Sequence, residues 1–95
     1  MYVLISKVTV NFDGLHSLKE KRSRLKKLKS SLFNKYKITA VESDNHNMHN
    51  VATIGFSAVS LKKAFLEKMY ENILEHIEIH NQHKIISQEN LIEKY

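Results

Sequence analysis

The sequence contains no cysteine, no proline and no tryptophan, and it has only two glycines. Without cysteine the chain can form no disulfide, no thiolate metal site and no cysteine nucleophile, so an intracellular protein is expected. No proline- or glycine-rich tract marks a linker between domains. We therefore expect a single domain over residues 1–95, a length sufficient to bury one hydrophobic core.

Long hydrophobic runs are also absent. The apolar stretch at the N-terminus is broken by Ser6 and Lys7, and no stretch approaches the roughly 18 apolar residues of a membrane span. No basic region precedes that stretch, as a secretory signal would require. The sequence thus predicts a soluble, cytoplasmic protein with no membrane partner.

Negative charge is scarce in one part of the chain. The formal net charge is +5, with 15 Lys and Arg against 10 Asp and Glu. Nine of the basic residues lie between Lys19 and Lys37, where Glu20 is the only acid, whereas the segment from Glu67 to Glu78 holds four acids. This uneven distribution favours an anionic partner.

Alternating apolar and polar residues predict four strands. Residues 1–12 place Leu4, Val8, Val10 and Phe12 on one face, and residues 51–59 place Ala52, Ile54, Phe56 and Ala58 on one face. Residues 36–44 and 84–92 have the composition of two further strands.

Two helices are predicted between these strands. The first begins at a capping box, Ser17 to Glu20, and runs to about Lys35. Its apolar stripe consists of Leu18, Leu25, Leu28 and Leu32. The second is capped by Ser60 and ends near His80 and Asn81. Its apolar stripe is spaced by four, and three further residues widen it: Leu61, Phe65, Met69, Ile73 and Ile77, with Ala64, Leu66 and Leu74.

The order of these elements predicts the fold class. A βαββαβ order fits an antiparallel four-stranded sheet with two helices packed on one of its faces. This arrangement is the ferredoxin-like α+β two-layer sandwich.

The first helix carries the main candidate site, which we call the basic ridge: Lys19, Arg22, Lys26 and Lys29. Their spacing of three and four residues aligns these side chains on one edge of the helix. Such a row can follow the phosphates of a nucleic acid. His16 is added to the candidate set because it lies close to the helix N-terminus, where free amides favour anions. Lys21 is added because, although it points away from the ridge, it broadens the positive field of the helix. The competing interpretation is a solvated helix face that only keeps the protein soluble.

The sheet face opposite the helices is predicted to lack aromatic side chains, on which RNA bases stack in RNA-recognition motifs. It is instead partly apolar, with Val3, Ile5, Val51 and Val59. Because an exposed apolar patch of this kind often marks an interface, a homodimer through this face is a second possibility.

No recognisable motif indicates catalysis, a metal or a cofactor. The six histidines include His76, His80 and His83 in one group, and Asp44, His46 and His49 in another. Neither group has the ligand spacing of a known metal motif, and turn chemistry or surface exposure explains both. A non-enzymatic protein without metal or cofactor is expected.

Two separated motifs are the segment HSLKEKR at residues 16–22, and Glu42 and Asp44 combined with the run ATIG at residues 52–55. In this order they resemble the YlxP-like family of small bacterial proteins of unknown function. His49 and Val51 stand where that family often has Trp and Arg. The resemblance implies a ferredoxin-like fold, a gene that in many members lies beside translation and ribosome-maturation factors, and no established enzyme activity.

These observations give two functional hypotheses. The first is a non-enzymatic protein that binds RNA or a ribosomal particle through the basic ridge. The alternative is a dimeric module that binds a small ligand or a protein through the face of the sheet opposite the helices.

Overall fold

A computed structural model describes residues 1–80 and 84–95 of the chain. Its elements follow the predicted order, and the bounds are given in chain order: β1 Tyr2–Asn11, α1 Leu18–Tyr36, β2 Val41–Asp44, β3 Val51–Ser60, α2 Lys63–Glu75, a π-helical turn η1 His76–His80, and β4 Lys84–Lys94.

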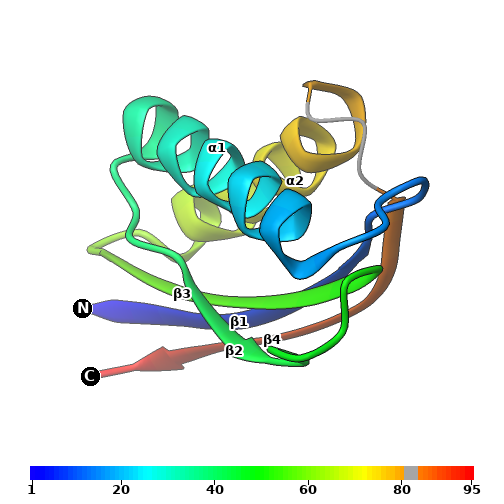
Figure 1. The fold of residues 1–95 in the computed structure, drawn as a ribbon. Helices are drawn as coiled ribbons and strands as arrows, with labels where there is room; N and C mark the ends of the chain where they lie inside the picture. Colours follow the sequence, from blue (N-terminus) through cyan, green and yellow to red (C-terminus); the bar gives the residue numbers. More distant parts are fainter. Residues whose placement is uncertain (81–83) are drawn as a thin grey trace.

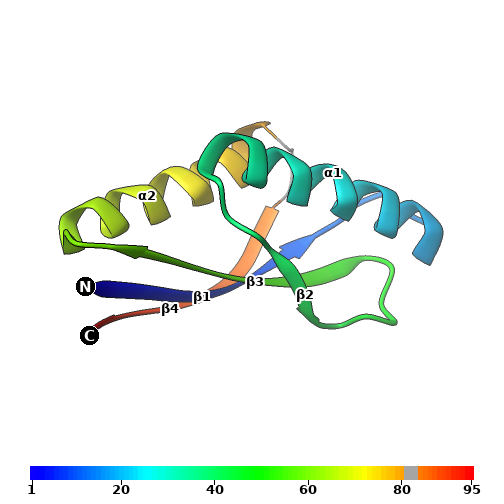
Figure 2. The ribbon, with the colours of Figure 1, turned by 90° about the vertical axis from the view of Figure 1, so that its left-hand side faces the viewer.

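The four strands form one antiparallel sheet in the order β2-β3-β1-β4. Both helices lie on the same side of this sheet, and the residues that the structure describes form no layer on the other side (Figure 1, Figure 2). We call the uncovered side the open face. This is the ferredoxin-like α+β two-layer sandwich that the sequence predicted.

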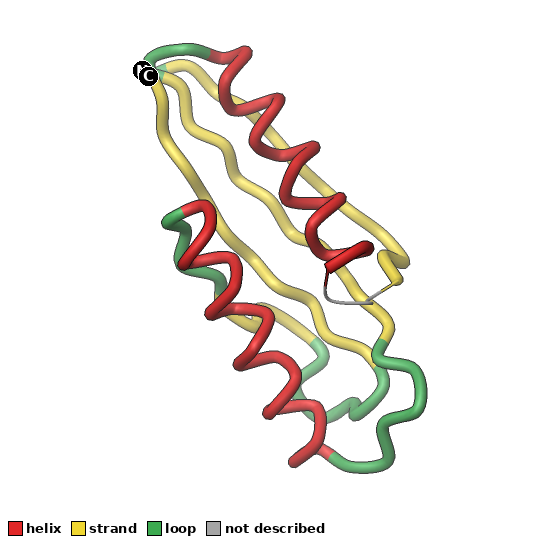
Figure 3. The backbone as a smooth tube through the Cα atoms, turned by 90° about the horizontal axis from the view of Figure 1, so that it is seen from above, coloured by secondary structure: helices red, strands yellow, loops and turns green. Residues whose placement is uncertain are grey.

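The sheet brings the two ends of the chain together. The backbone amide of Tyr95 donates to the carbonyl of Met1 at 2.6 Å, and the amino terminus donates to the carbonyl of Tyr95 at 2.9 Å. Figure 3, seen from the helix side, shows both termini at one corner. The two helices lie along the strands, and the chain runs through them in opposite directions.

The predicted core faces of the strands are confirmed. Leu4, Val8, Val10 and Phe12 of the N-terminal segment are buried, as are Ala52, Ile54 and Phe56 of β3. They join one hydrophobic cluster with Leu25, Leu28 and Leu32 of α1. Alternation along β1 and β3 therefore sends apolar side chains toward the helices.

The start of α1 follows the capping prediction in part. The Glu20 backbone amide donates to the Ser17 hydroxyl at 3.2 Å, as expected of an N-cap. The Glu20 carboxylate, however, accepts from the amide of His16 at 3.3 Å and not from that of Ser17. The helix ends at Tyr36, and its C-cap Lys37 has a left-handed backbone (φ 58°) and donates its amide to the carbonyl of Phe33.

The predicted stripe of α2 is wrong at its N-terminal end. Leu61 and Phe65 are exposed, and the buried positions are Leu66, Tyr70, Ile73 and Ile77. A strict spacing of four advances about 40° around a helix at each step, so such a series leaves the buried face within a few turns. A series whose spacing alternates between four and three residues remains on the buried face, as the observed buried positions do.

Several predicted boundaries also shift. The second strand is confined to Val41–Asp44, and α2 begins at Lys63 with Lys62 as its N-cap. Ser60 is not that cap, although its hydroxyl accepts from the amide of Lys62 at 3.1 Å. The prediction that the second helix ends near Asn81 concerns a residue outside the described part of the chain. His83, which was considered for a metal site, also lies outside it. Within residues 1–80 and 84–95, no helix is both long enough and apolar enough to cross a membrane.

Candidate nucleic-acid interface

The basic ridge lies along one side of α1. At 3.6 residues per turn, its four positions fall within about 80° of the helix circumference and extend over about 15 Å of its length. Lys19, Arg22 and Lys26 are exposed, and Lys29 is half-buried. The stripe of buried leucines lies next to the ridge, so docking of α1 on the sheet leaves the four cations at one edge of the helix.

None of the four ridge cations has a carboxylate within 4.0 Å among the described residues, where the ion pairs formed are Lys7–Asp44, Lys21–Glu42 and Lys68–Glu71. Like charges at a spacing of three or four residues destabilise a helix by about 0.2–0.5 kcal/mol per pair. The three successive pairs of the ridge thus repel one another with no internal compensation. A polyanion placed along the ridge would relieve that repulsion.

Lys21 does not belong to this surface, which corrects its place in the predicted set. Its side chain is 1% exposed, and its ammonium lies 2.7 Å from a Glu42 carboxylate oxygen. It also donates to the carbonyl of Asn45 at 2.6 Å. Its position had a detectable signal, because Leu18, Lys21 and Leu25 continue the three–four spacing of the buried stripe.

His16 is exposed beside the first turn of α1, as expected from its place in the sequence. Its backbone amide is engaged by the Glu20 carboxylate. That carboxylate adds negative charge at the helix N-terminus and offsets its attraction for an anion. His16 therefore lies next to the ridge, whereas the helix terminus itself adds little to phosphate binding.

The far end of the ridge carries an aromatic residue that the sequence reasoning missed. Phe33 follows Lys29 by four residues, and its side chain is 52% exposed. The Lys37 ammonium lies 5.8 Å from the centre of its ring. A pocket of about 290 Å³ beside it is lined by Lys29, Phe33, Asn34 and the segment 38–40, among others. Spacing alone could have revealed that Phe33 continues the ridge.

The open face has a polar centre. Lys7 and Asp44 form an ion pair at 3.0 Å, and the Asn45 side-chain amide donates to the Thr53 hydroxyl, which in turn contacts the Thr9 hydroxyl at 2.9 Å. The hydrogen bond and charge of Lys7 lower the pKa of Asp44, and those of Asp44 raise the pKa of Lys7. These groups and Glu89 line a shallow pocket of about 320 Å³.

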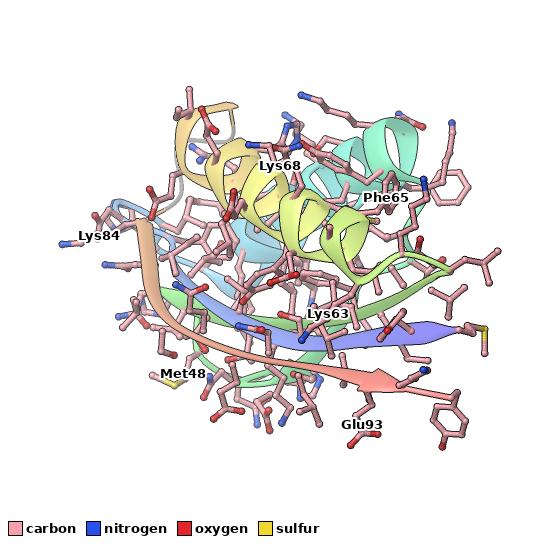
Figure 4. The ribbon with its side chains drawn as sticks, turned by 180° about the vertical axis from the view of Figure 1, so that it is seen from behind. Met48, Lys63, Phe65, Lys68, Lys84 and Glu93 are labelled. Carbon is pink, nitrogen blue, oxygen red and sulfur yellow. The ribbon has the colours of Figure 1, made fainter. Side chains whose placement is uncertain are left out.

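The end of the open face near the chain termini is apolar. The strand register places Val59 opposite Val3, and Leu91 opposite Ile5. Val59, Ile5 and Leu91 are 62%, 51% and 52% exposed. In Figure 4, Glu93 of β4 points below the sheet, away from the helices, and marks the same face.

The described histidines form no cluster with acidic side chains that could hold a metal ion. Over residues 1–80 and 84–95, no three side chains of His, Asp or Glu are arranged to hold a metal ion. His46 contacts the carbonyl of Glu42 at 2.7 Å, and the buried His76 contacts the Ser31 hydroxyl at 3.1 Å. The ring of His83 lies outside the described residues.

Fold and surface together define a small ferredoxin-like protein whose first helix has a basic edge that forms no ion pair with the described residues. Residues 3–90 match the family model of a protein of unknown function, DUF503, so the chain belongs to that family. Among curated proteins, none has a sequence that matches this chain.

Proposed function

We propose that this chain is a non-enzymatic RNA- or ribosome-associated binding protein of the cytoplasm, which contacts phosphates through the basic ridge. The observation that carries the proposal is the row of four cations on one edge of α1, none within 4.0 Å of a carboxylate in the described part of the chain. A surface that only maintains solubility usually intersperses both signs of charge. The ridge contains one sign alone.

Counterion release provides the driving force. Each phosphate neutralised by Lys or Arg releases condensed cations, and four contacts give a log–log salt slope of about −3.6 on a duplex or about −2.8 on a single strand. The resemblance of residues 16–22 to the YlxP-like family supports the same proposal, because it implies a gene near translation and ribosome-maturation factors.

The test is a salt series of RNA binding. Association of the wild-type chain with bacterial ribosomal RNA or ribosomal subunits is measured between about 50 and 200 mM salt, and the slope should approach the values above. The variant Lys19→Glu, Arg22→Glu, Lys26→Glu, Lys29→Glu should lose both the affinity and most of the slope.

A matched control places the same charge change elsewhere. Lys63→Glu, Lys68→Glu, Lys84→Glu, Lys94→Glu alters four exposed lysines of α2 and β4, three of which are labelled in Figure 4. This variant should keep most of the affinity, because its changes lie off the ridge. If the two variants lost RNA affinity equally, the loss would depend only on net charge and not on the ridge. This result would refute the proposal.

A second function is favoured by the apolar end of the open face. Ile5, Val59 and Leu91 form a contiguous exposed group on three neighbouring strands. The face of a four-stranded sheet of this length measures about 30 Å by 15–20 Å. That area, about 450–600 Å², is below the roughly 800 Å² per partner of a standard interface, and the alternative proposed for this face is a homodimer.

Elution volume separates the two functions. If the open face joins two copies, Ile5→Lys with Val59→Lys should shift the protein to the monomer volume in size exclusion. An elution volume that these changes leave unaltered would argue against the interface.

A further inference from the structure

The C-terminal end of the ridge differs chemically from the rest. Lys29 is followed one turn later by Phe33, and the two side chains share one pocket with Asn34 and Thr39. Its volume of about 290 Å³ is near the lower end of small-molecule pockets, which span about 300–1,000 Å³. It therefore has room for one small group, not for an extended ligand.

The composition of this pocket matches the parts of a nucleotide. The exposed Phe33 ring provides an aromatic face, and Asn34 provides an amide that can both donate and accept. Lys29 supplies a cation on the ridge side, and none of the described residues that line the pocket is a carboxylate. An aromatic face, an amide and a cation are the groups that proteins use to stack a base, read its edge and hold its phosphate.

Lys37 adds a second cation at this end. Its ammonium lies 5.8 Å from the centre of the Phe33 ring, and Phe33, which lines the pocket, is 52% exposed. Lys37 adopts the left-handed conformation that glycine usually occupies after a helix. A lysine held at this position keeps its charge beside the aromatic ring despite that backbone cost.

We propose that Phe33 stacks one unpaired base of a single-stranded RNA whose neighbouring phosphates are held by Lys29 and Lys37. The inference rests on the proposed function, since the same strand continues along the basic ridge. It adds a preference: bases in a duplex are already stacked on one another and cannot reach the ring, so single-stranded segments bind more tightly than duplexes of equal charge.

The first experiment compares substitution at two exposed phenylalanines. Phe33→Leu keeps an apolar side chain but removes the aromatic face, and it should weaken binding of an oligouridylate about 5- to 50-fold with an unchanged salt slope. Binding of a blunt RNA duplex should not change. Phe65→Leu is the control, because Phe65 is 58% exposed and lies on α2 (Figure 4). Phe33→Tyr should restore binding of the oligouridylate.

The second experiment uses the absence of tryptophan from the chain. In Phe33→Trp the single indole should be quenched when oligouridylate binds, and in Phe65→Trp it should not. Uridine 5′-monophosphate should quench the Phe33→Trp protein only at much higher concentration, because it makes no contact with the rest of the ridge. Equal affinity for the monophosphate would identify a site for a free nucleotide and overturn the single-strand assignment.

The outcomes separate this inference from the proposed function. If Phe33→Leu binds oligouridylate as the wild type does, while the ridge variant loses binding, the stacking site is refuted and the ridge proposal stands. If the wild type binds neither oligouridylate nor ribosomal RNA at low salt, both are refuted.

Discussion

At the scale of single residues, the contact between Lys21 and Glu42 ties the first turns of α1 to the β2–β3 hairpin. The lysine also donates to the carbonyl of Asn45, a residue with a left-handed backbone (φ 65°) in the turn of that hairpin. The ammonium is buried, whereas the Glu42 side chain keeps 17% exposure. Removal of either partner alone leaves a largely desolvated charge without its counterpart.

We therefore expect Lys21→Met to lower the free energy of unfolding by about 2–3 kcal/mol, slightly below the range for fully buried pairs because Glu42 retains some solvent. The double variant Lys21→Met, Glu42→Leu should recover most of this loss, since it removes both charges. Urea unfolding of the wild type, Lys21→Met, Glu42→Leu and the double variant measures the coupling between the two side chains. A Lys21→Met protein as stable as the wild type would contradict a structural role for this pair.

The Lys7–Asp44 pair predicts a pH dependence on the open face. Lys7 holds the pKa of Asp44 below its ordinary 3.8, so this contribution is present above that value and is lost as pH falls through the lowered pKa. Asp44 raises the pKa of Lys7 above 10.5, so the lysine contribution is lost as pH rises through the raised pKa.

Lys7→Gln should move the pKa of Asp44 back toward 3.8, as measured by NMR titration of the side-chain carboxyl carbon. Ser43→Ala should have a smaller effect, because the Ser43 hydroxyl is a lesser cause of the shift. An unchanged Asp44 titration in Lys7→Gln would show that the pair does not persist in solution.

At the scale of the element, the like charges of the basic ridge destabilise α1 and at the same time favour phosphate binding. Lys26 has a like charge four residues before it, at Arg22, and another three residues after it, at Lys29. Lys26→Glu turns both repulsive pairs into attractive ones, while Lys and Glu have similar helix propensities. The change should raise the free energy of unfolding by about 0.5–1 kcal/mol at low salt and weaken RNA binding.

Lys27→Glu is the matched change on the same helix. Its only charged neighbour at a spacing of three or four is Arg24, and it projects about 100° away from Lys26. It should stabilise α1 less and leave more of the RNA affinity. If Lys26→Glu destabilised the protein, the ridge repulsion described above would be incorrect.

At the scale of the whole molecule, the two candidate surfaces lie in different layers. The basic ridge belongs to the helix layer, and the apolar group of Ile5, Val59 and Leu91 belongs to the open face of the sheet (Figure 2). One surface can therefore be occupied without covering the other.

This separation predicts independent effects. Ridge variants should leave the elution volume unchanged, and Ile5→Lys with Val59→Lys should leave the intrinsic affinity for a short RNA unchanged. Amide shift changes on addition of that RNA should concentrate on α1 and residues 37–40. If they centred on β1 and β4, the assignment of the RNA site would be wrong.

Local sequence patterns were sufficient to predict the order of elements, the buried faces of β1 and β3 and the cap at Ser17. These features depend on neighbours within a few residues, because alternation and helical spacing are properties of the chain itself. The alignment of the basic ridge follows from the same local geometry.

Tertiary structure decided which distant residues these elements contact. Lys21 finds its partners 21 and 24 residues away, and Lys7 finds Asp44 at a separation of 37, so no local spacing could have assigned those contacts. The buried face of α2 and the apolar group on the open face likewise depend on docking and strand register. The spacing along α1 places Phe33 in line with the ridge, but the pocket that it shares with the segment 38–40 forms only once α1 has packed against the sheet.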